Sequence, residues 1–254
     1  MITARTGRTE WEFKDLPPQS GKEGIVASLL DRMGGRYASA LDINLAGGAS
    51  SELFKWFLAS VLFGVRIGEG IAMKTYREFE KAGALSARAI LDTGWQGLVD
   101  ILDRGGYVRY DFKTATKLLE IMRALEEKYH GDLNRLHSAA KDETDLEQRL
   151  QDLGKGIGPV TANIFLRELR DVWEKAKPRL SEPALLAARN LGLAERTTPD
   201  LVLGELQLIW KASARKGSFA DFEAALVRLG KNFCGKGKCS SCPMKPECSH
   251  GESG

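Results

Sequence analysis

The sequence predicts an all-α protein. Apolar residues recur at helical spacing along most of its 254 residues, and runs typical of β-strands are scarce. Hydrophobic residues make up 43% of the chain and charged residues 28%, which excludes a disordered tail, a collagen-like repeat and a disulfide-stapled miniprotein. Because glycines interrupt the helical pattern at intervals, we expect about ten helices around one or two cores.

The expected elements follow in chain order. Residues 1–21 are polar and form an N-terminal extension outside the core. Glu23–Arg32 has apolar residues at helical spacing, and Glu52–Val65 is an apolar helix with Ser50 and Ser51 as candidate caps. Further helices are predicted at residues 71–82, 86–91, 95–104, 113–129, 145–153, 160–175, 182–191, 199–214 and 219–229.

The chain shows no sign of membrane insertion or export. Its first residues mix charges without an apolar core, and the longest apolar run, Trp56–Val65, is about half of what a membrane span requires. We therefore expect a cytoplasmic protein without a membrane partner, in a reducing compartment.

All four cysteines fall close together near the C-terminus, as Cys234, Cys239, Cys242 and Cys248. Four thiolates can bind zinc tetrahedrally or hold a [4Fe–4S] cluster. Zinc sites usually comprise two Cys-x2–4-Cys knuckles separated by a longer stretch, whereas all the gaps here are short, which favours the cluster. Four unligated thiols are disfavoured because exposed thiols are reactive.

Positive charge is concentrated before and within this cysteine cluster. The net charge of the whole chain is only +3, yet the segment from Trp210 to Lys238 carries seven cationic side chains and two acidic ones. This distribution is typical of a polyanion-binding face, although a solvated helix surface is the alternative.

Alternating glycines join two predicted helices at residues 150–166. Gly154, Gly156 and Gly158 permit positive φ and close approach, and Pro159 suits the first turn of the second helix. Such a turn directs backbone N–H groups and the helix dipole at one point, which suits a phosphate. A dinucleotide-binding turn would need a preceding strand, and a purely structural turn is the remaining alternative.

The glycine hairpin, followed about seventy residues later by the cysteine loop, resembles the helix-hairpin-helix DNA glycosylases of the endonuclease III and adenine-glycosylase type. Residues 50–62, 188–193 and 229–234 extend the resemblance, which spans Lys22 to Cys248. The first cysteine gap is four residues here and typically longer in the family. The resemblance implies a six-helix barrel domain at 45–165, a cluster domain from 22–44 plus 166–254, and a DNA-binding cleft between them.

The resemblance also implies a monomeric, nucleoid-associated protein whose partner is double-stranded DNA with a lesion or abasic site. The target nucleotide would be flipped, a [4Fe–4S] cluster would shape the loop, and the hairpin could hold a monovalent cation. Arg66 lies near the family's wedge side chain. The implied DNA-binding residues are Gly154, Lys155, Gly156, Ile157, Gly158, Val160, Thr161, Arg66, Lys231, Lys236 and Lys238.

Two positions depart from the family. Its lysine, which attacks C1′ and forms a Schiff base, falls on Val160, and its aspartate falls on Ser181. Strand cleavage by lyase chemistry is therefore not expected. Loss of the carboxylate is more serious, because cleavage of an N-glycosidic bond passes through an oxocarbenium-like state that a carboxylate stabilises.

Other residues could replace the missing aspartate. Glu182 takes its place if the alignment shifts by one residue, and Asp171 or Glu174 could reach the site from the segment after the hairpin helix. Tyr107–Lys113 is a further source of a reactive group. A solvated acid or a packed tyrosine is the alternative for each, so the sequence leaves open a DNA glycosylase with a non-standard carboxylate, a catalytically inactive DNA-structure-binding protein, and a redox element.

Overall fold

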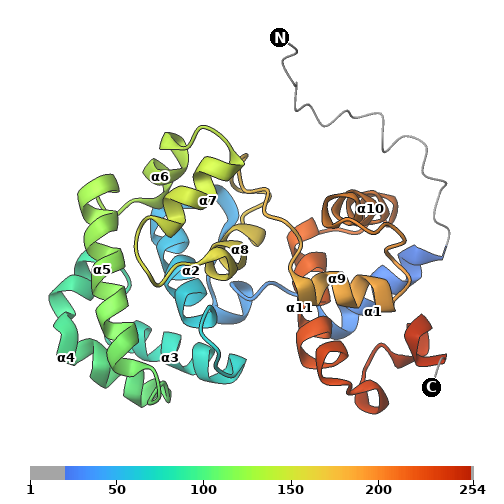
Figure 1. The fold of residues 1–254 in the computed structure, drawn as a ribbon, viewed down its shortest axis with the longest axis horizontal. Helices are drawn as coiled ribbons and strands as arrows, with labels where there is room; N and C mark the ends of the chain where they lie inside the picture. The colour runs from blue at the N-terminus through green and yellow to red at the C-terminus, as the bar shows by residue number, and fades with distance from the viewer. Residues whose placement is uncertain (1–20, 253–254) are drawn as a thin grey trace, which may run out of the picture. The chain divides into compact units, whose positions relative to one another are not determined.

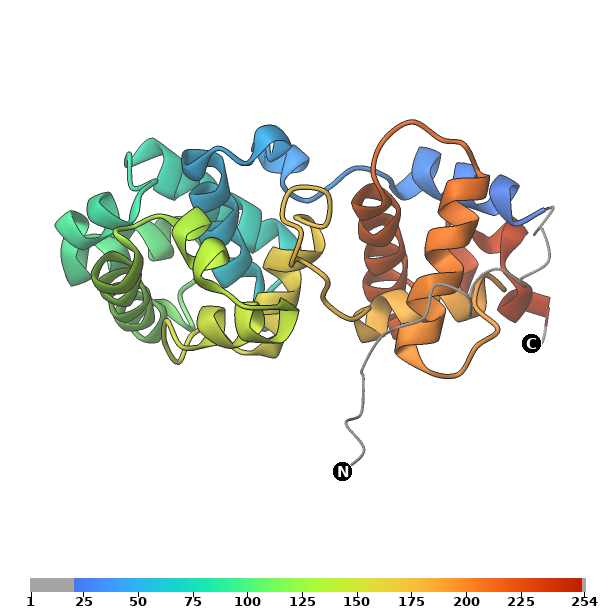
Figure 2. The same cartoon turned by 90° about the horizontal axis from the view of Figure 1, so that it is seen from above.

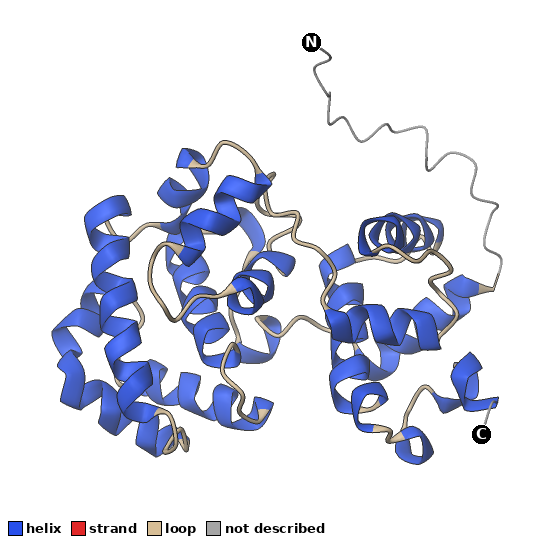
Figure 3. Ribbon diagram, in the orientation of Figure 1, coloured by secondary structure: helices blue, strands red, loops and turns tan. Residues whose placement is uncertain are grey.

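The computed structural model describes residues 21–252, and within this range every regular element is helical (Figure 3). Eleven α-helices and several short 3-10 turns account for the described chain, which confirms the all-α prediction. None of the helices in these residues is both long enough and apolar enough to span a bilayer.

The chain folds as two compact units. The central unit comprises Arg36–Pro178, and the terminal unit joins the residues up to Gly35 with those from Arg179 onward. The domain boundaries implied by the resemblance, at 45 and 165, lie inside the central unit and stay a prediction. The expected extension, 1–21, lies outside the described residues apart from Gly21.

The central unit contains seven α-helices (Figure 1). Its core forms around the apolar helix α2, where Trp56 is fully buried and donates its indole N–H to the carbonyl of Phe165 at 3.0 Å. The 3-10 turns η2 (Ser39–Leu41) and η3 (Ala46–Gly48) precede α2. The helices are α2 (Ser50–Phe63), α3 (Glu69–Lys81), α4 (Ala87–Gly105), α5 (Asp111–Tyr129), α6 (Leu133–Ala139), α7 (Glu143–Gln151) and α8 (Pro159–Arg167).

The terminal unit packs α11 against α1 and α9, and Figure 2 shows α10 beside α11. A capping box formed by Ser218 and Asp221 starts α11. Near its other end, Arg228 donates to carbonyls at the C-terminal end of α1, including those of Met33 and Gly34. The elements are α1 (Lys22–Met33), α9 (Glu182–Asn190), α10 (Pro199–Ala212), α11 (Phe219–Asn232), η4 (Cys234–Lys236), η5 (Cys239–Ser241), η6 (Lys245–Glu247) and η7 (Ser249–Glu252).

One predicted helix is wrong in length. The pattern predicts a helix over 160–175, but α8 ends at Arg167 and turns follow it. The reason is Glu168, whose fully buried carboxylate accepts the N–H groups of Tyr37 at 2.8 Å and Ala38 at 2.9 Å. Burial raises the pKa of Glu168, while these amides and two nearby arginines oppose the rise. This anchor holds the chain after α8 against the segment before α2.

One other difference lies between α3 and α7. The two helices predicted at 86–91 and 95–104 both form and share the label α4, with a break at Gly94, whose φ of 68° and ψ of 172° are not helical. The short helix α6 was not predicted. It has seven residues, and the Asp132 side chain caps it by accepting the N–H of Asn134 at 2.9 Å.

Candidate nucleic-acid interface

The hairpin turn between α7 and α8, residues 152–158, packs directly against α5. A Cβ built on Gly154 would lie 3.0 Å from Ile121 Cγ1, and one on Gly156 would lie 2.8 Å from Ile121 Cδ1. The expectation of positive φ is wrong here, because the three hairpin glycines all have negative or extended φ. Close approach to α5 is therefore the physical reason for Gly154 and Gly156.

The open side of the hairpin turn is the N-terminus of α8. Gly158 is the extended residue before this helix, and no heavy atom lies within 4 Å of a Cβ built on it. The first amides of a helix have no intrahelical acceptor, and together with the helix dipole they favour an anion. Val160 stands on this first turn with 66% of its surface exposed. The turn can thus receive a phosphate at its backbone.

Of the other predicted hairpin residues, one is exposed and two are buried. Lys155 is exposed, whereas Ile157 and Thr161 are each 4% exposed. Thr161 packs against α2, since a Cβ on Gly64 would lie only 2.2 Å from its Oγ1. Arg66 is exposed in the bend that follows α2.

A groove on the terminal unit brings together three of the predicted site residues. It has a volume of about 460 Å³ and lies between α9 and the end of α11 with η4. Glu182, Lys231 and Lys236 line it, and we call it the cationic groove. The complete lining is Glu182, Pro183, Leu186, Arg189, Gly230, Lys231, Gly235 and Lys236.

Sequence reasoning missed Arg189 and Leu186 in this groove. Leu186 is 38% exposed, and the Arg189 guanidinium donates to the carbonyl of Thr197 at 3.1 Å. Leu186 follows Glu182 by four residues and Arg189 follows it by seven, which places all three on one face of α9. This spacing was the available signal.

The basic segment does not act as one surface. Arg215 pairs with Asp31 at 3.3 Å, and Arg228 holds the end of α1, so both side chains help to pack α1. Lys238 is exposed in the turn before η5. Among the predicted lysines, Lys231 and Lys236 line the groove.

The four cysteines lie in the segment of short 3-10 turns that runs from η4 to the residue after η6. Burial raises the pKa of Cys234; a hydrogen bond with Asn190 opposes the rise, and the other three thiols add to it. The pKa of Cys242 is likewise raised, mainly by burial. Within residues 21–252, however, no three His, Cys, Asp or Glu side chains are arranged to hold a metal ion. The donor set fits a thiolate-bound cluster in its chemistry, and the cluster stays a prediction.

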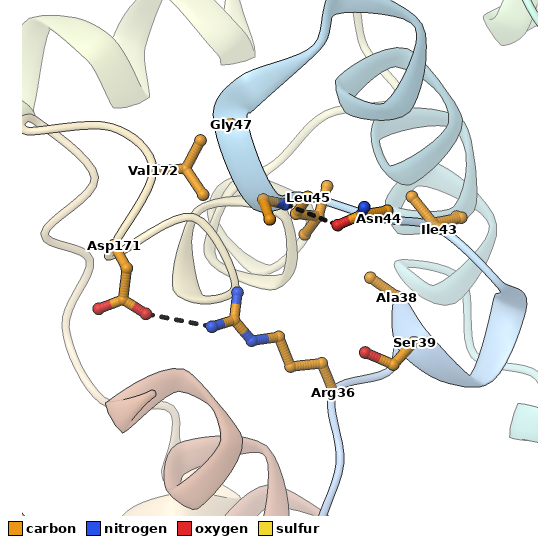
Figure 4. A pocket seen from close by; sticks show the side chains of 10 residues that line it. Arg36, Ala38, Ser39, Ile43, Asn44, Leu45, Gly47, Asp171 and Val172 are labelled. Carbon is orange, nitrogen blue, oxygen red and sulfur yellow. Dashed lines mark hydrogen bonds and ion pairs between the residues drawn. The ribbon is translucent and has the colours of Figure 1, made fainter. Parts of the chain in front are cut away.

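Asp171 and Glu174 both lie in the turns after α8. Asp171 lines a pocket of about 380 Å³ with residues of the η2–η3 segment, and its carboxylate faces Arg36 (Figure 4). The ion pair between them measures 3.1 Å. Glu174 is exposed near His137. The structure thus places these two acids on the central unit and Glu182 on the terminal unit.

The two positions that depart from the resemblance hold neither an amine nor a carboxylate. Val160 projects into solvent on α8. Ser181 is the residue before α9, and its buried Oγ has no hydrogen-bond partner in the described structure. Tyr107, a further candidate, is a packed tyrosine whose hydroxyl donates to the Leu62 carbonyl at 2.7 Å. Burial raises its pKa further above the ordinary value.

Solved structures share this arrangement of helices. A thermostable thymine-DNA glycosylase is 16% identical, with 92% of this chain and 97% of that chain covered and a TM-score of 0.53. An endonuclease III trapped in a covalent intermediate with DNA is 19% identical, with 91% and 97% covered and a TM-score of 0.51. The chain has the endonuclease III fold. No family model and no curated protein matches the sequence.

This fold confirms the architecture that the hairpin and the cysteine loop predicted. The match covers more than nine tenths of this chain in both cases. At these identities the likeness concerns the fold, and the chemistry depends on the residues described above.

Proposed function

We propose that this protein binds damaged duplex DNA and acts in DNA repair. The observation that carries this is the hairpin turn, whose glycines pack on α5 while the N-terminus of α8 stays open beside Gly158. Backbone amides at a helix N-terminus suit a DNA phosphate. Support comes from two neighbours in fold, one a thymine-DNA glycosylase and the other an endonuclease III bound to DNA.

The cationic groove would supply a second set of phosphate contacts. Arg189, Lys231 and Lys236 face one groove, and neutralising phosphates with such side chains releases counterions from DNA. Binding should therefore weaken as salt rises.

Base excision is the finer part of the proposal, with Glu182 as the carboxylate. It stands on the first turn of α9, next to the position of the family's aspartate, and it is exposed in the cationic groove. Asp171 is less suited because Arg36 engages its carboxylate. With Val160 at the lysine position, excision would proceed by water and not through a Schiff base.

A panel of duplexes, each with one damaged or mismatched base, tests base excision. Alkali cleaves the strand wherever a base has been removed, so wild-type protein should yield a shorter strand for at least one lesion. Glu182→Gln should abolish the product while keeping DNA affinity, and the controls Asp171→Asn and Glu174→Gln should retain it. Product that is unchanged in Glu182→Gln would contradict the role of Glu182.

A catalytically inactive DNA-structure-binding protein is the second candidate function. It is favoured by the loss of both reactive groups, since Val160 and Ser181 can neither attack C1′ nor stabilise positive charge. It predicts tight, salt-dependent binding without product for every lesion tested. The same panel therefore separates the two functions.

We propose a [4Fe–4S] cluster on Cys234, Cys239, Cys242 and Cys248. The four cysteines sit in one segment of short 3-10 turns, and four cysteines are the usual donors of such a cluster. A brown protein with about four irons per chain is expected. A colourless protein loaded with zinc would contradict this assignment.

A further inference from the structure

The cationic groove combines positive charge with apolar surface. Leu186 of α9 is exposed in it. Three cations and a single acid also line the groove, namely Arg189, Lys231, Lys236 and Glu182. DNA phosphates would use the charge but not the apolar surface, because phosphate contacts are made by polar groups. The groove therefore suits a second ligand that carries both negative charge and apolar side chains.

Residues 10–16 of the same chain have this chemistry. They read Glu-Trp-Glu-Phe-Lys-Asp-Leu and lie outside the described residues. Three acids and one lysine give them a net charge of −2, while three cations and one acid give the groove lining +2. Trp11, Phe13 and Leu16 add apolar surface, and aromatic side chains contribute the largest buried areas at binding sites. Segment and groove are thus complementary in charge, and both are partly apolar.

The start of α1 holds this segment within reach of the groove. Lys22, the first residue of α1, pairs with Glu195 at 3.0 Å. Two residues further along the chain, Thr197 accepts the hydrogen bond from Arg189 of the groove at 3.1 Å. Eleven residues lead from Trp11 to Lys22, and an extended chain of that length spans up to about 36 Å. The segment can therefore reach the groove of its own chain, within the terminal unit.

Attachment to α1 also favours this segment over a separate partner. A ligand joined to its site by a short stretch of chain meets that site at an effective concentration of about 1 mM. A separate protein, or a second copy of this chain, would have to bind much more tightly to occupy the groove to the same extent. The chain's own segment is therefore the occupant that the charges and the tether favour.

We propose that residues 10–16 dock in the cationic groove of their own chain and compete there with DNA. This proposal rests on the proposed DNA binding and adds an autoinhibitory contact to the same site. The aromatic side chains cover Leu186, and the acids face Lys231 and Lys236. A duplex must then displace the segment, so its apparent affinity falls with the fraction of molecules in which the groove is open.

Duplex affinity of the full chain, measured by fluorescence anisotropy, tests the competition. Trp11→Ala with Phe13→Ala should raise affinity about threefold, which corresponds to docking in about two molecules of three. Ile2→Ala, at an apolar residue outside the segment, is the matched control and should bind like the wild type. When Lys231→Ala and Lys236→Ala are already present, the two aromatic substitutions should have no further effect. Equal affinity in the wild type and the aromatic variant would overturn the proposal.

A fluorescent synthetic peptide of residues 8–18 tests docking without DNA. It should bind the Trp11→Ala, Phe13→Ala protein, whose own segment no longer docks, and the wild type about threefold more weakly. Adding Lys231→Ala and Lys236→Ala to that protein should weaken peptide binding about threefold, the loss expected for two exposed ion pairs. A peptide of the same composition in scrambled order is the control, and thermal unfolding shows whether each variant is folded.

The outcomes separate docking from DNA binding. If the wild type binds the duplex but the peptide binds none of the proteins, docking is wrong and DNA binding stands. If the peptide binds as expected and no protein binds the duplex, the proposed DNA binding falls and the docking site stands. A wild-type dimer that becomes a monomer in Trp11→Ala, Phe13→Ala, measured by size-exclusion chromatography with light scattering, would place the segment on a second copy and overturn docking within one chain.

Discussion

The hairpin turn and the cationic groove are two candidate contacts for DNA, and they are built differently. The hairpin turn offers backbone amides, and its shape depends on two glycines packed against a single helix, α5. The groove offers charged side chains from α9 and from the segment that ends α11, far apart in sequence. A backbone site is thus set by local spacing, whereas a side-chain site depends on how two helices pack.

At Gly230, α11 packs so closely on α9 that there is no room for a side chain. A Cβ at this residue of α11 would lie 1.9 Å from the Pro183 carbonyl oxygen of α9, and backbone cannot move aside as a side chain can. Gly230→Ala should therefore lower the free energy of unfolding by about 3 kcal/mol. Urea denaturation followed by circular dichroism measures this change.

Gly158→Ser is the matched variant in the hairpin turn. No heavy atom lies within 4 Å of a Cβ there, and serine is a favourable residue at the start of a helix. The free energy of unfolding should stay within about 0.5 kcal/mol of the wild type. A larger loss in Gly158→Ser than in Gly230→Ala would reverse the comparison.

Removing charge from the groove should weaken duplex binding without unfolding the protein. Each phosphate contact contributes about 0.9 to the slope of log affinity against log salt. The double variant Lys231→Ala, Lys236→Ala should lower that slope by about 1.8 and the affinity about tenfold. Lys81→Ala on α3, which pairs with Glu78 at 2.8 Å, is the control. Equal slopes in all three proteins would show that DNA does not contact the groove.

Much of this comparison could be predicted from the sequence. The alternating glycines and Pro159 predicted the hairpin turn. Close packing on α5 requires glycine, and the first turn of a helix accepts proline, so both features can be read from the local sequence. For the groove, the sequence predicted Glu182, Lys231 and Lys236 as site residues but not Arg189 and Leu186. These two residues meet the lysines only because α9 packs on α11. The end of α8 was missed because Glu168 bonds to amides about 130 residues earlier in the chain, which no local pattern reports.

His137, which lies in the central unit, should make the stability of that unit depend on pH. It stacks on Trp173 with ring centroids 4.7 Å apart, and burial, together with Lys175, lowers its pKa from the ordinary value of 6.5. The folded central unit therefore takes up this proton less readily than the unfolded chain. Neutral His137 contributes its full stabilisation above about pH 6.5, the ordinary histidine pKa. This contribution is lost as the pH falls from there through the lowered pKa of the folded state.

Denaturation at about pH 7.5 and about pH 5, on either side of the histidine range, measures this effect. His137→Phe keeps an aromatic ring on Trp173 and removes the titrating group, so its stability should depend less on pH. The control His130→Asn, at an exposed residue with φ 56°, should behave like the wild type. This is the smallest of the expected effects. Identical pH dependence in all three proteins would assign the acid response to other groups.

The most direct test of DNA binding at the hairpin turn is the duplex affinity of two substitutions at Val160. This side chain is 66% exposed on the first turn of α8, so either charge is tolerated by the fold, and an acidic residue there favours the helix dipole. With a duplex carrying an abasic-site analogue, Val160→Asp should lower affinity at least tenfold while keeping thermal stability, and Val160→Lys should raise affinity. Equal affinities in Val160→Asp, Val160→Lys and the wild type would contradict the account.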